Sequence, residues 1–174
     1  MANRLPGLTT LLLITLSPAA TAQSSQVLEM ELHAERLEVV VDESGSQARR
    51  LVAVTQFLPG EKVIYTVQFT NITESVQEHV SIVQPLPEHM VYVLDSAVGP
   101  GTDITFSIDG GANFATAGEL VAEDENGVPV VVEPEAYTHI RWSMRKNLAP
   151  GATGYARFRA VFHYRENADL GDRD

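Results

Sequence analysis

Residues 59–71 read PGEKVIYTVQFTN, and this stretch decides the fold. After the Pro-Gly turn, apolar side chains recur at every second position, at Val63, Tyr65, Val67 and Phe69. Mostly polar side chains stand between them, which is the period of a β-strand that buries one face. We therefore predict that this stretch is a central strand of a β-sandwich.

Two stretches near the C-terminus show the most regular alternation of apolar and polar side chains, residues 138–144 and residues 155–164. We predict that they pair as a hairpin joined by residues 147–153. The alternation places Trp142 and Phe158 on the apolar faces of the two strands, so we expect both side chains in the core.

Residues 27–41 change phase along their length. Their apolar side chains occupy even-numbered positions in the first half and odd-numbered positions in the second half. A strand here requires a bulge or break near residues 34–36. A helix would instead place Glu31 and Glu35 one turn apart and would end in three β-branched residues. We choose the strand, and we expect the chain to return through a polar hairpin loop at residues 42–46.

Glycine and proline mark the ends of the remaining short strands. We predict one strand that stops at residues 85–87, because its two prolines cannot donate to a sheet ladder. A second strand should cover residues 90–98 and a short third one residues 104–108. Residues 112–135 are acidic and rich in loops, with a tight hairpin at Asn126-Gly127.

Many short strands without a convincing helix predict an all-β protein. The spacing of strands and turns favours an immunoglobulin-like antiparallel β-sandwich of two sheets and about 7–9 strands. We expect a single domain over residues 23–174, with its core at about residues 27–165, because about 150 residues bury one normal hydrophobic core.

The N-terminus predicts export. One basic residue, Arg4, precedes an apolar run over residues 8–16, and small residues follow up to Ala22. This order is typical of a secretory signal peptide, here residues 1–22, cleaved after Ala22. The alternative is an uncleaved membrane anchor, but the run is shorter than the roughly 20 apolar residues that span a bilayer. We expect a periplasmic, extracellular or cell-surface protein with no transmembrane segment after cleavage.

The net charge of −11 and the absence of cysteine narrow the function. Nucleic acids and anionic membranes require a basic face, so we expect neither as the main partner of this acidic protein. Without cysteine the chain has neither disulfides nor a lipid-modified cysteine.

Four landmarks follow one another in the chain: residues 59–71, PLPEHMVYV at 85–93, THIRW at 138–142 and LAPG at 148–151. In this order the sequence resembles the bacterial conserved-repeat family called "domain of unknown function 11", over nearly the whole mature chain. The resemblance implies an immunoglobulin-like β-sandwich of exported and cell-surface proteins, often present in tandem copies. This chain departs from that pattern by having one copy and no surface-anchoring signal. The family implies no chemistry.

The acidic loops of residues 103–135 offer oxygen ligands of the kind that calcium prefers. A calcium- or carbohydrate-dependent binding domain that uses these loops is therefore the alternative function. An EF-hand spacing is broken, because Ala122 stands where its first aspartate belongs. We expect that no metal ion or cofactor holds the fold together.

No catalytic motif is present, since the chain has no Gly-x-Ser-x-Gly elbow, no His-Glu-x-x-His and no phosphate-cradling loop. The five histidines stand at separate predicted positions: His139 and His163 in strands, His79 before a strand, His89 after a proline turn and His33 in the ambiguous first strand. We therefore expect no enzymatic activity. Asn71-Ile72-Thr73 matches a glycosylation sequon, but a turn at the end of a strand explains it without a sugar.

Charge is distributed unevenly along the chain. Residues 63–140 hold twelve acidic and no basic residues, whereas residues 141–165 hold six basic and no acidic ones. If the last two strands pair, Arg141, Arg157 and Arg159 share one outward face, which is our candidate partner-binding face. Two interpretations stand: a solvated face that discourages aggregation, or a basic surface that meets an acidic partner.

The partners that fit such a surface are other envelope proteins, a second copy of the chain or an anionic polymer. The sequence thus predicts an exported, noncatalytic cell-envelope or extracellular module. We expect it to act in structural assembly, or in binding proteins and polymers, through its sheet faces and edges.

Overall fold

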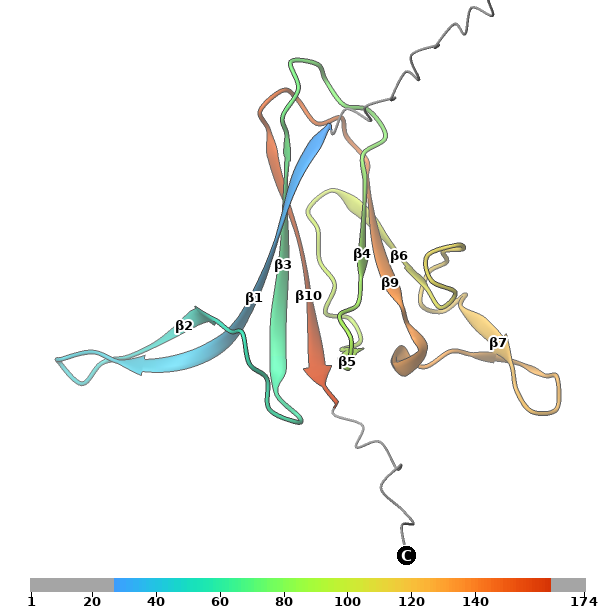
Figure 1. Cartoon of the computed structure of the whole chain (residues 1–174), viewed down its shortest axis with the longest axis horizontal. Coiled ribbons are helices and arrows are strands. Elements are labelled where there is room, and N and C mark those ends of the chain that lie inside the picture. The colour runs from blue at the N-terminus through green and yellow to red at the C-terminus, as the bar shows by residue number, and fades with distance from the viewer. Residues whose placement is uncertain (1–26, 164–174) are drawn as a thin grey trace, which may run out of the picture.

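The computed structural model describes residues 27–163, and Figure 1 shows facing β-sheets with a two-stranded hairpin projecting from each side. The sheets are antiparallel, and the only other regular element in this part of the chain is a short 3-10 turn. The predicted signal peptide lies outside the described residues. The elements are β1 (Leu28–Val41), β2 (Gln47–Ala53), β3 (Lys62–Asn71), β4 (Ser81–Pro85), β5 (Met90–Tyr92), β6 (Thr102–Ser107), β7 (Val121–Glu123), β8 (Pro129–Val131), η1 (Pro134–Ala136), β9 (His139–Met144) and β10 (Thr153–Phe162).

The strands form two main sheets and one small sheet. The larger main sheet has the order β2-β1-β3-β10-β5, and the other has the order β4-β9-β6. Among the described strands, β7 and β8 pair only with each other. β3 lies in the middle of the larger sheet, where Val67 is opposite Leu32 of β1 and Ala156 of β10. This confirms the predicted central strand.

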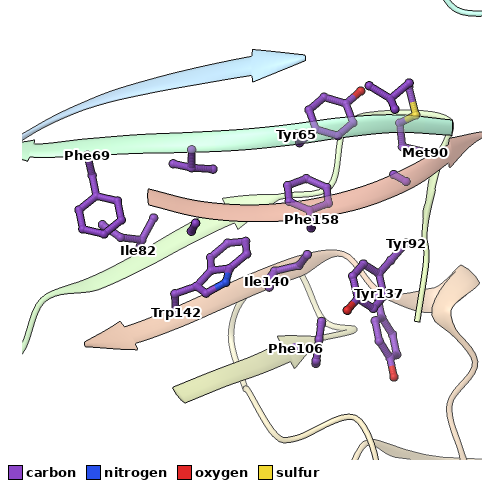
Figure 2. Packing of buried hydrophobic residues seen from close by; sticks show 14 of the residues in the cluster. Tyr65, Phe69, Ile82, Met90, Tyr92, Phe106, Tyr137, Ile140, Trp142 and Phe158 are labelled. Carbon is purple, nitrogen blue, oxygen red and sulfur yellow. The ribbon is translucent and has the colours of Figure 1, made fainter. Parts of the chain in front are cut away.

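Side chains from both main sheets meet in one core, which Figure 2 shows from close by. Trp142 of β9 and Phe158 of β10 are completely buried, with 6.2 Å between their ring centroids. Phe158 also stacks on Tyr65 of β3 at 5.0 Å, so these aromatic rings connect the two sheets. The predicted inward positions of Trp142 and Phe158 are confirmed. Burial raises the pKa of Tyr65 to about 12, because the ionised phenol would lose its solvation.

The predicted hairpin between the last two strands is wrong. β9 pairs with β4 and β6, whereas β10 pairs with β3 and β5, so the two strands belong to opposite sheets. The connection between them carries Leu148, which is buried and exchanges backbone hydrogen bonds with Gln77. Because this apolar side chain anchors the middle of the connection in the core, the chain crosses from one sheet to the other instead of turning back.

The predicted bulge or break near residues 34–36 is also wrong, because β1 is continuous. The strand instead changes its partner there: Glu35 is paired with Ile64 of β3 on one side and with Ala53 of β2 on the other. Before Glu35 the even-numbered side chains share the face of the buried β3 residues. After Glu35 the strand leaves β3 and continues into the hairpin with β2, where the odd-numbered side chains are apolar (Figure 1).

The predicted strand over residues 90–98 is shorter than expected, since β5 ends at Tyr92. Asp95 adopts a left-handed backbone conformation with φ of 57°, which an extended strand does not contain. The Tyr92 hydroxyl accepts a hydrogen bond from the Ala97 N–H at 3.0 Å and fixes this turn. The chain regains the sheet only at Val98, which pairs with Arg157.

The predicted turns are confirmed. β4 ends at Pro85, and the polar loop 42–46 joins β1 to β2. β7 and β8 form a hairpin around Gly127, whose φ of 75° requires the left-handed region that glycine tolerates. With this hairpin the described residues hold ten strands, against about 7–9 expected from the spacing of strands and turns.

Gly154 of β10 gives a first testable prediction. It pairs with Phe69 of β3, and a Cβ atom at residue 154 would overlap the Phe69 ring. Gly154→Ala should therefore lower the free energy of unfolding by about 1–3 kcal/mol, as overpacking of a core does. Urea melts in the wild-type and Phe69→Leu backgrounds provide the check, because the smaller side chain should reduce the loss. An equal loss in both backgrounds would contradict the clash.

Candidate binding surface

The outer side of the larger sheet, facing away from the core, carries charge in two separate columns. Acidic side chains line β1, basic side chains line β10, and the outward side chains of β3 between them are uncharged over the paired rows. We call this surface the charged face. The rows across β1, β3 and β10 are Glu29–Thr70–Thr153, Glu31–Gln68–Tyr155, His33–Thr66–Arg157 and Glu35–Ile64–Arg159.

The two charged columns do not neutralise each other. Neighbouring strands lie about 4.8 Å apart, so β1 and β10 are separated by about 10 Å across β3. Within residues 27–163 no ion pair joins the acids of β1 to Arg157 or Arg159. The charged face therefore presents one negative and one positive edge to its surroundings.

Neighbouring contacts hold the basic column in place. The Arg157 Nε donates to the Thr66 hydroxyl at 2.9 Å, and the Arg157 side chain thereby covers the outward but buried Thr66. The backbone N–H of Arg159 donates to the Ser96 hydroxyl at 3.0 Å. Tyr155 and Val98 are more than half exposed on the same side of β10. The positive edge thus combines two guanidinium groups with apolar surface.

The predicted grouping of three arginines is wrong for one of them. Arg157 and Arg159 share the outward side of β10, but Arg141 belongs to β9 in the opposite sheet. There its Nε donates to the Thr105 hydroxyl at 3.1 Å, and its guanidinium lies 4.2 Å from the centre of the Phe114 ring. The three side chains share no face, because β9 and β10 do not pair.

The hairpin of β1 and β2 beyond Glu35, residues 36–53, projects from the body and is called the β1–β2 arm (Figure 1). On β1 the odd-numbered side chains form an outward apolar row in which Leu37, Val39 and Val41 are 54%, 60% and 58% exposed, and the polar Gln47 and Arg49 of β2 lie opposite Val41 and Val39. Because β3 no longer pairs with β1 there, no strand of residues 27–163 lies beside the backbone edge of β1 away from β2 over residues 36–41. The arm thus presents both an apolar row and a sheet edge.

The sequence contained a signal for the arm, namely the change of phase within residues 27–41. We interpreted it as a bulge because a strand with one buried side should keep its phase. The structure shows that the strand has a different partner and a different exposed side in each half. The basic residues Arg49 and Arg50 of β2 also indicate exposure, since a buried partner strand would be apolar.

Several of the loop acids considered for calcium bind protein groups instead. Oδ1 of Asp124 accepts from the N–H groups of Asn126 and Val128, at 2.8 and 2.9 Å. Asp103 forms an ion pair with Arg145 at 2.7 Å. Within residues 27–163 no group of three or more His, Cys, Asp or Glu side chains is placed to hold a metal ion. These carboxylates act as turn and pairing groups.

Asp109 gives a second prediction, on pH. Its carboxylate accepts from the N–H groups of Asn113 and Ala112 and from the Ser107 hydroxyl, and these hydrogen bonds hold its pKa well below the usual range. Because this pKa is lower in the folded than in the unfolded state, the carboxylate stabilises the fold at pH values above the ordinary aspartate pKa. This contribution is lost as the pH falls from that value towards the folded-state pKa. Asp109→Asn should therefore be less stable than wild type at pH 7, and the difference should shrink towards pH 2. Thermal melts across this range check it, and a constant difference would contradict it.

The sequon residue Asn71 is completely buried. Its Nδ2 donates to the backbone carbonyls of Ser75 and Leu148, at 2.8 and 3.0 Å. Its Oδ1 accepts from the N–H and hydroxyl of Thr73. The structure thus uses this side chain to close the turn after β3, which agrees with the turn interpretation of the sequon.

No protein-family model, curated protein or solved structure matches this chain. Among residues 27–163, no helix has the length and apolar character that crossing a membrane requires.

Proposed function

We propose that this chain is an exported, noncatalytic assembly module of the cell envelope or the extracellular space, and that it binds through the β1–β2 arm. The observation that carries the proposal is the apolar row of Leu37, Val39 and Val41, each more than half exposed. Contiguous exposed apolar surface marks interaction sites, whereas single exposed apolar side chains are ordinary. A two-stranded hairpin is only marginally stable by itself in water, so contact with a partner would also stabilise the arm.

The unpaired edge of β1 supports binding by strand addition. An extended segment of a partner beside residues 36–41 would gain backbone hydrogen bonds from β1. The same segment could place apolar side chains on the row formed by Leu37, Val39 and Val41. Backbone pairing would then supply affinity, and the apolar row would supply specificity.

We also propose that the β-sandwich is of the immunoglobulin-like kind found in the domain of unknown function 11 family. The sequence landmarks of that resemblance help to form the fold. Residues 59–71 include β3, Trp142 fills the core, and Leu148 anchors the crossover between the sheets. This family is associated with exported and cell-surface proteins, which supports the assembly role.

Substitution of the apolar row tests the function. Leu37→Thr, Val39→Thr and Val41→Thr together keep a good strand former at each position but remove apolar surface. We expect the variant to be exported and folded, while its retention in envelope assemblies falls at least about tenfold, since each buried apolar side chain contributes about 1.5–3 kcal/mol. Native gels and fractionation of the exporting cells measure the retention.

The matched control makes the same change at three exposed apolar residues outside the arm, as Leu58→Thr, Val76→Thr and Val83→Thr. This control should behave like the wild type. If the arm variant and the control keep equal retention, the arm is not the binding element.

Export gives a further prediction. The protein recovered after secretion should begin at Gln23, because the small residues before it form a signal-peptidase site. N-terminal sequencing provides the check. A chain recovered from the membrane fraction with Met1 intact would contradict both the cleavage and the localisation.

A further inference from the structure

We propose that the charged face docks on the same face of a second copy of this chain. This inference rests on the proposed assembly function and names the partner of one of its surfaces. The observation behind it is the separation of charge on one face, with acids on β1 and Arg157 and Arg159 on β10. A surface with both signs on opposite edges is complementary to itself when one copy is turned correctly.

The direction of the two-fold axis determines which strands of the two copies face each other. A two-fold axis that runs along β3, between two stacked faces, exchanges the two edges of the sheet and keeps the level along the strands. It therefore places β1 of each copy over β10 of the other. An axis perpendicular to the strands would place β1 over β1 and set acid against acid. Charge thus favours the first arrangement, because like charges in contact are unfavourable.

The strand register then predicts a specific contact. Glu35 and Arg159 flank Ile64 in one row of the face. Rotation about β3 brings Glu35 of one copy over Arg159 of the other, and the symmetry repeats this contact. Ile64 lies at the axis and meets its own counterpart. The dimer thus has two symmetric ion pairs around an apolar centre.

The charged groups of Glu35 and Arg159 are available for this contact. Neither Glu35 nor Arg159 takes part in an ion pair within residues 27–163. The two residues lie about 10 Å apart across Ile64, which is about the Debye length at 0.1 M salt. The exposed Tyr155 and Val98 beside the arginines add the aromatic and apolar surface that protein interfaces use.

A charge-swap series tests the proposal. The full protein, purified after export, is studied by sedimentation velocity at about 20 mM and about 500 mM salt, where the Debye length is roughly 20 Å and roughly 4 Å. We expect a dimer that weakens at high salt. Glu35→Arg and Arg159→Glu should each weaken dimerisation at least about tenfold at low salt, and the double variant should return to within about threefold of wild type, because the swap restores complementarity.

Controls separate folding and other ligands from the proposed contact. Arg159 is exposed and Glu35 is partly buried, so each variant should melt within a few degrees of the wild type. Glu119→Arg, at an exposed acid away from the charged face, should leave the dimer unchanged. A wild type that is monomeric at low salt, or a double variant as weak as the singles, would overturn the proposal. A third result would also overturn it: if the protein forms no dimer but binds an anionic polysaccharide, and Arg159→Glu abolishes that binding, then the basic edge binds a polyanion instead.

Separate experiments test the dimer and the β1–β2 arm. The threonine substitutions in the β1–β2 arm test retention in envelope assemblies, whereas the charge swaps test a dimer of the purified protein. If the charge swaps change sedimentation as expected and the arm variant is retained like the wild type, the dimer stands and the arm proposal fails. The opposite pair of results would retain the arm and reject the dimer.

Discussion

Trp142→Ala should lower the free energy of unfolding by about 3–5 kcal/mol, as the loss of a large aromatic side chain from a core does. Trp142 is completely buried, contacts Phe158 of the facing sheet and packs beside Gly99, where an added Cβ would meet the indole. Its removal leaves a cavity between the two sheets that the surrounding strands cannot fill. Urea melts followed by circular dichroism measure the loss.

Trp142→Phe is the matched control for this prediction. A phenyl ring fills part of the space and also removes the indole Nε1, which has no hydrogen-bond partner in the described structure. The loss should therefore be clearly smaller than for alanine. A loss for Trp142→Ala below about 1 kcal/mol, the size of ordinary surface effects, would show that this side chain does not fill the core.

Asn71→Asp should be similarly disruptive, with an expected loss of about 3–5 kcal/mol at pH 7, the size observed for an uncompensated buried charge. The Asn71 Nδ2 donates to the carbonyls of Ser75 and Leu148, so the substitution places a buried carboxylate against two carbonyl oxygens. These bonds connect the end of β3 to its turn and to the crossover between β9 and β10. Their loss should loosen one end of the sandwich.

The pH dependence identifies the cause of this loss. Burial and repulsion by the two carbonyl oxygens raise the folded-state pKa of an aspartate at position 71 above its unfolded value, although Thr73 still donates to its Oδ1. The variant should therefore lose stability as the pH rises above about 4 and should be closest to the wild type below that value. Asn126→Asp in the exposed β7–β8 turn is the control, with an expected change within about 0.5 kcal/mol. Equal losses at pH 4 and pH 7 would contradict the buried-charge explanation.

Local alternation predicted the central part of the fold well. Val63, Tyr65, Val67 and Phe69 are buried as their period indicated, and Trp142 lies in the core. The period of a strand depends only on local side-chain direction, so a single sequence contains it. The pairing of strands depends on where the connections lead. The role of Leu148, which anchors the crossover in the core, cannot be recognised from alternation alone.

The candidate surface was predicted only in part for the same reason. Arg157 and Arg159 face outward on one strand, as their alternation with Phe158 indicated. Their acidic counterpart is Glu35, which lies more than 120 residues earlier in the chain and meets the same row only through β3. Long-range register of this kind is set by the whole sheet. Charge counts along the sequence show the twelve acidic residues of 63–140 but not that the acids of β1 share a face with these arginines.

The most direct test of the assembly role is site-specific photo-crosslinking at Val39 in exporting cells. Val39 lies in the middle of the apolar row of the β1–β2 arm, and Val83 of β4 is an exposed valine on the other main sheet that serves as the control position. We predict a discrete adduct of higher mass from Val39, lost when Leu37 and Val41 are both changed to threonine, and no such adduct from Val83. A stable, exported protein that gives no discrete adduct from Val39, or equal adducts from both positions, would contradict the arm as the binding element.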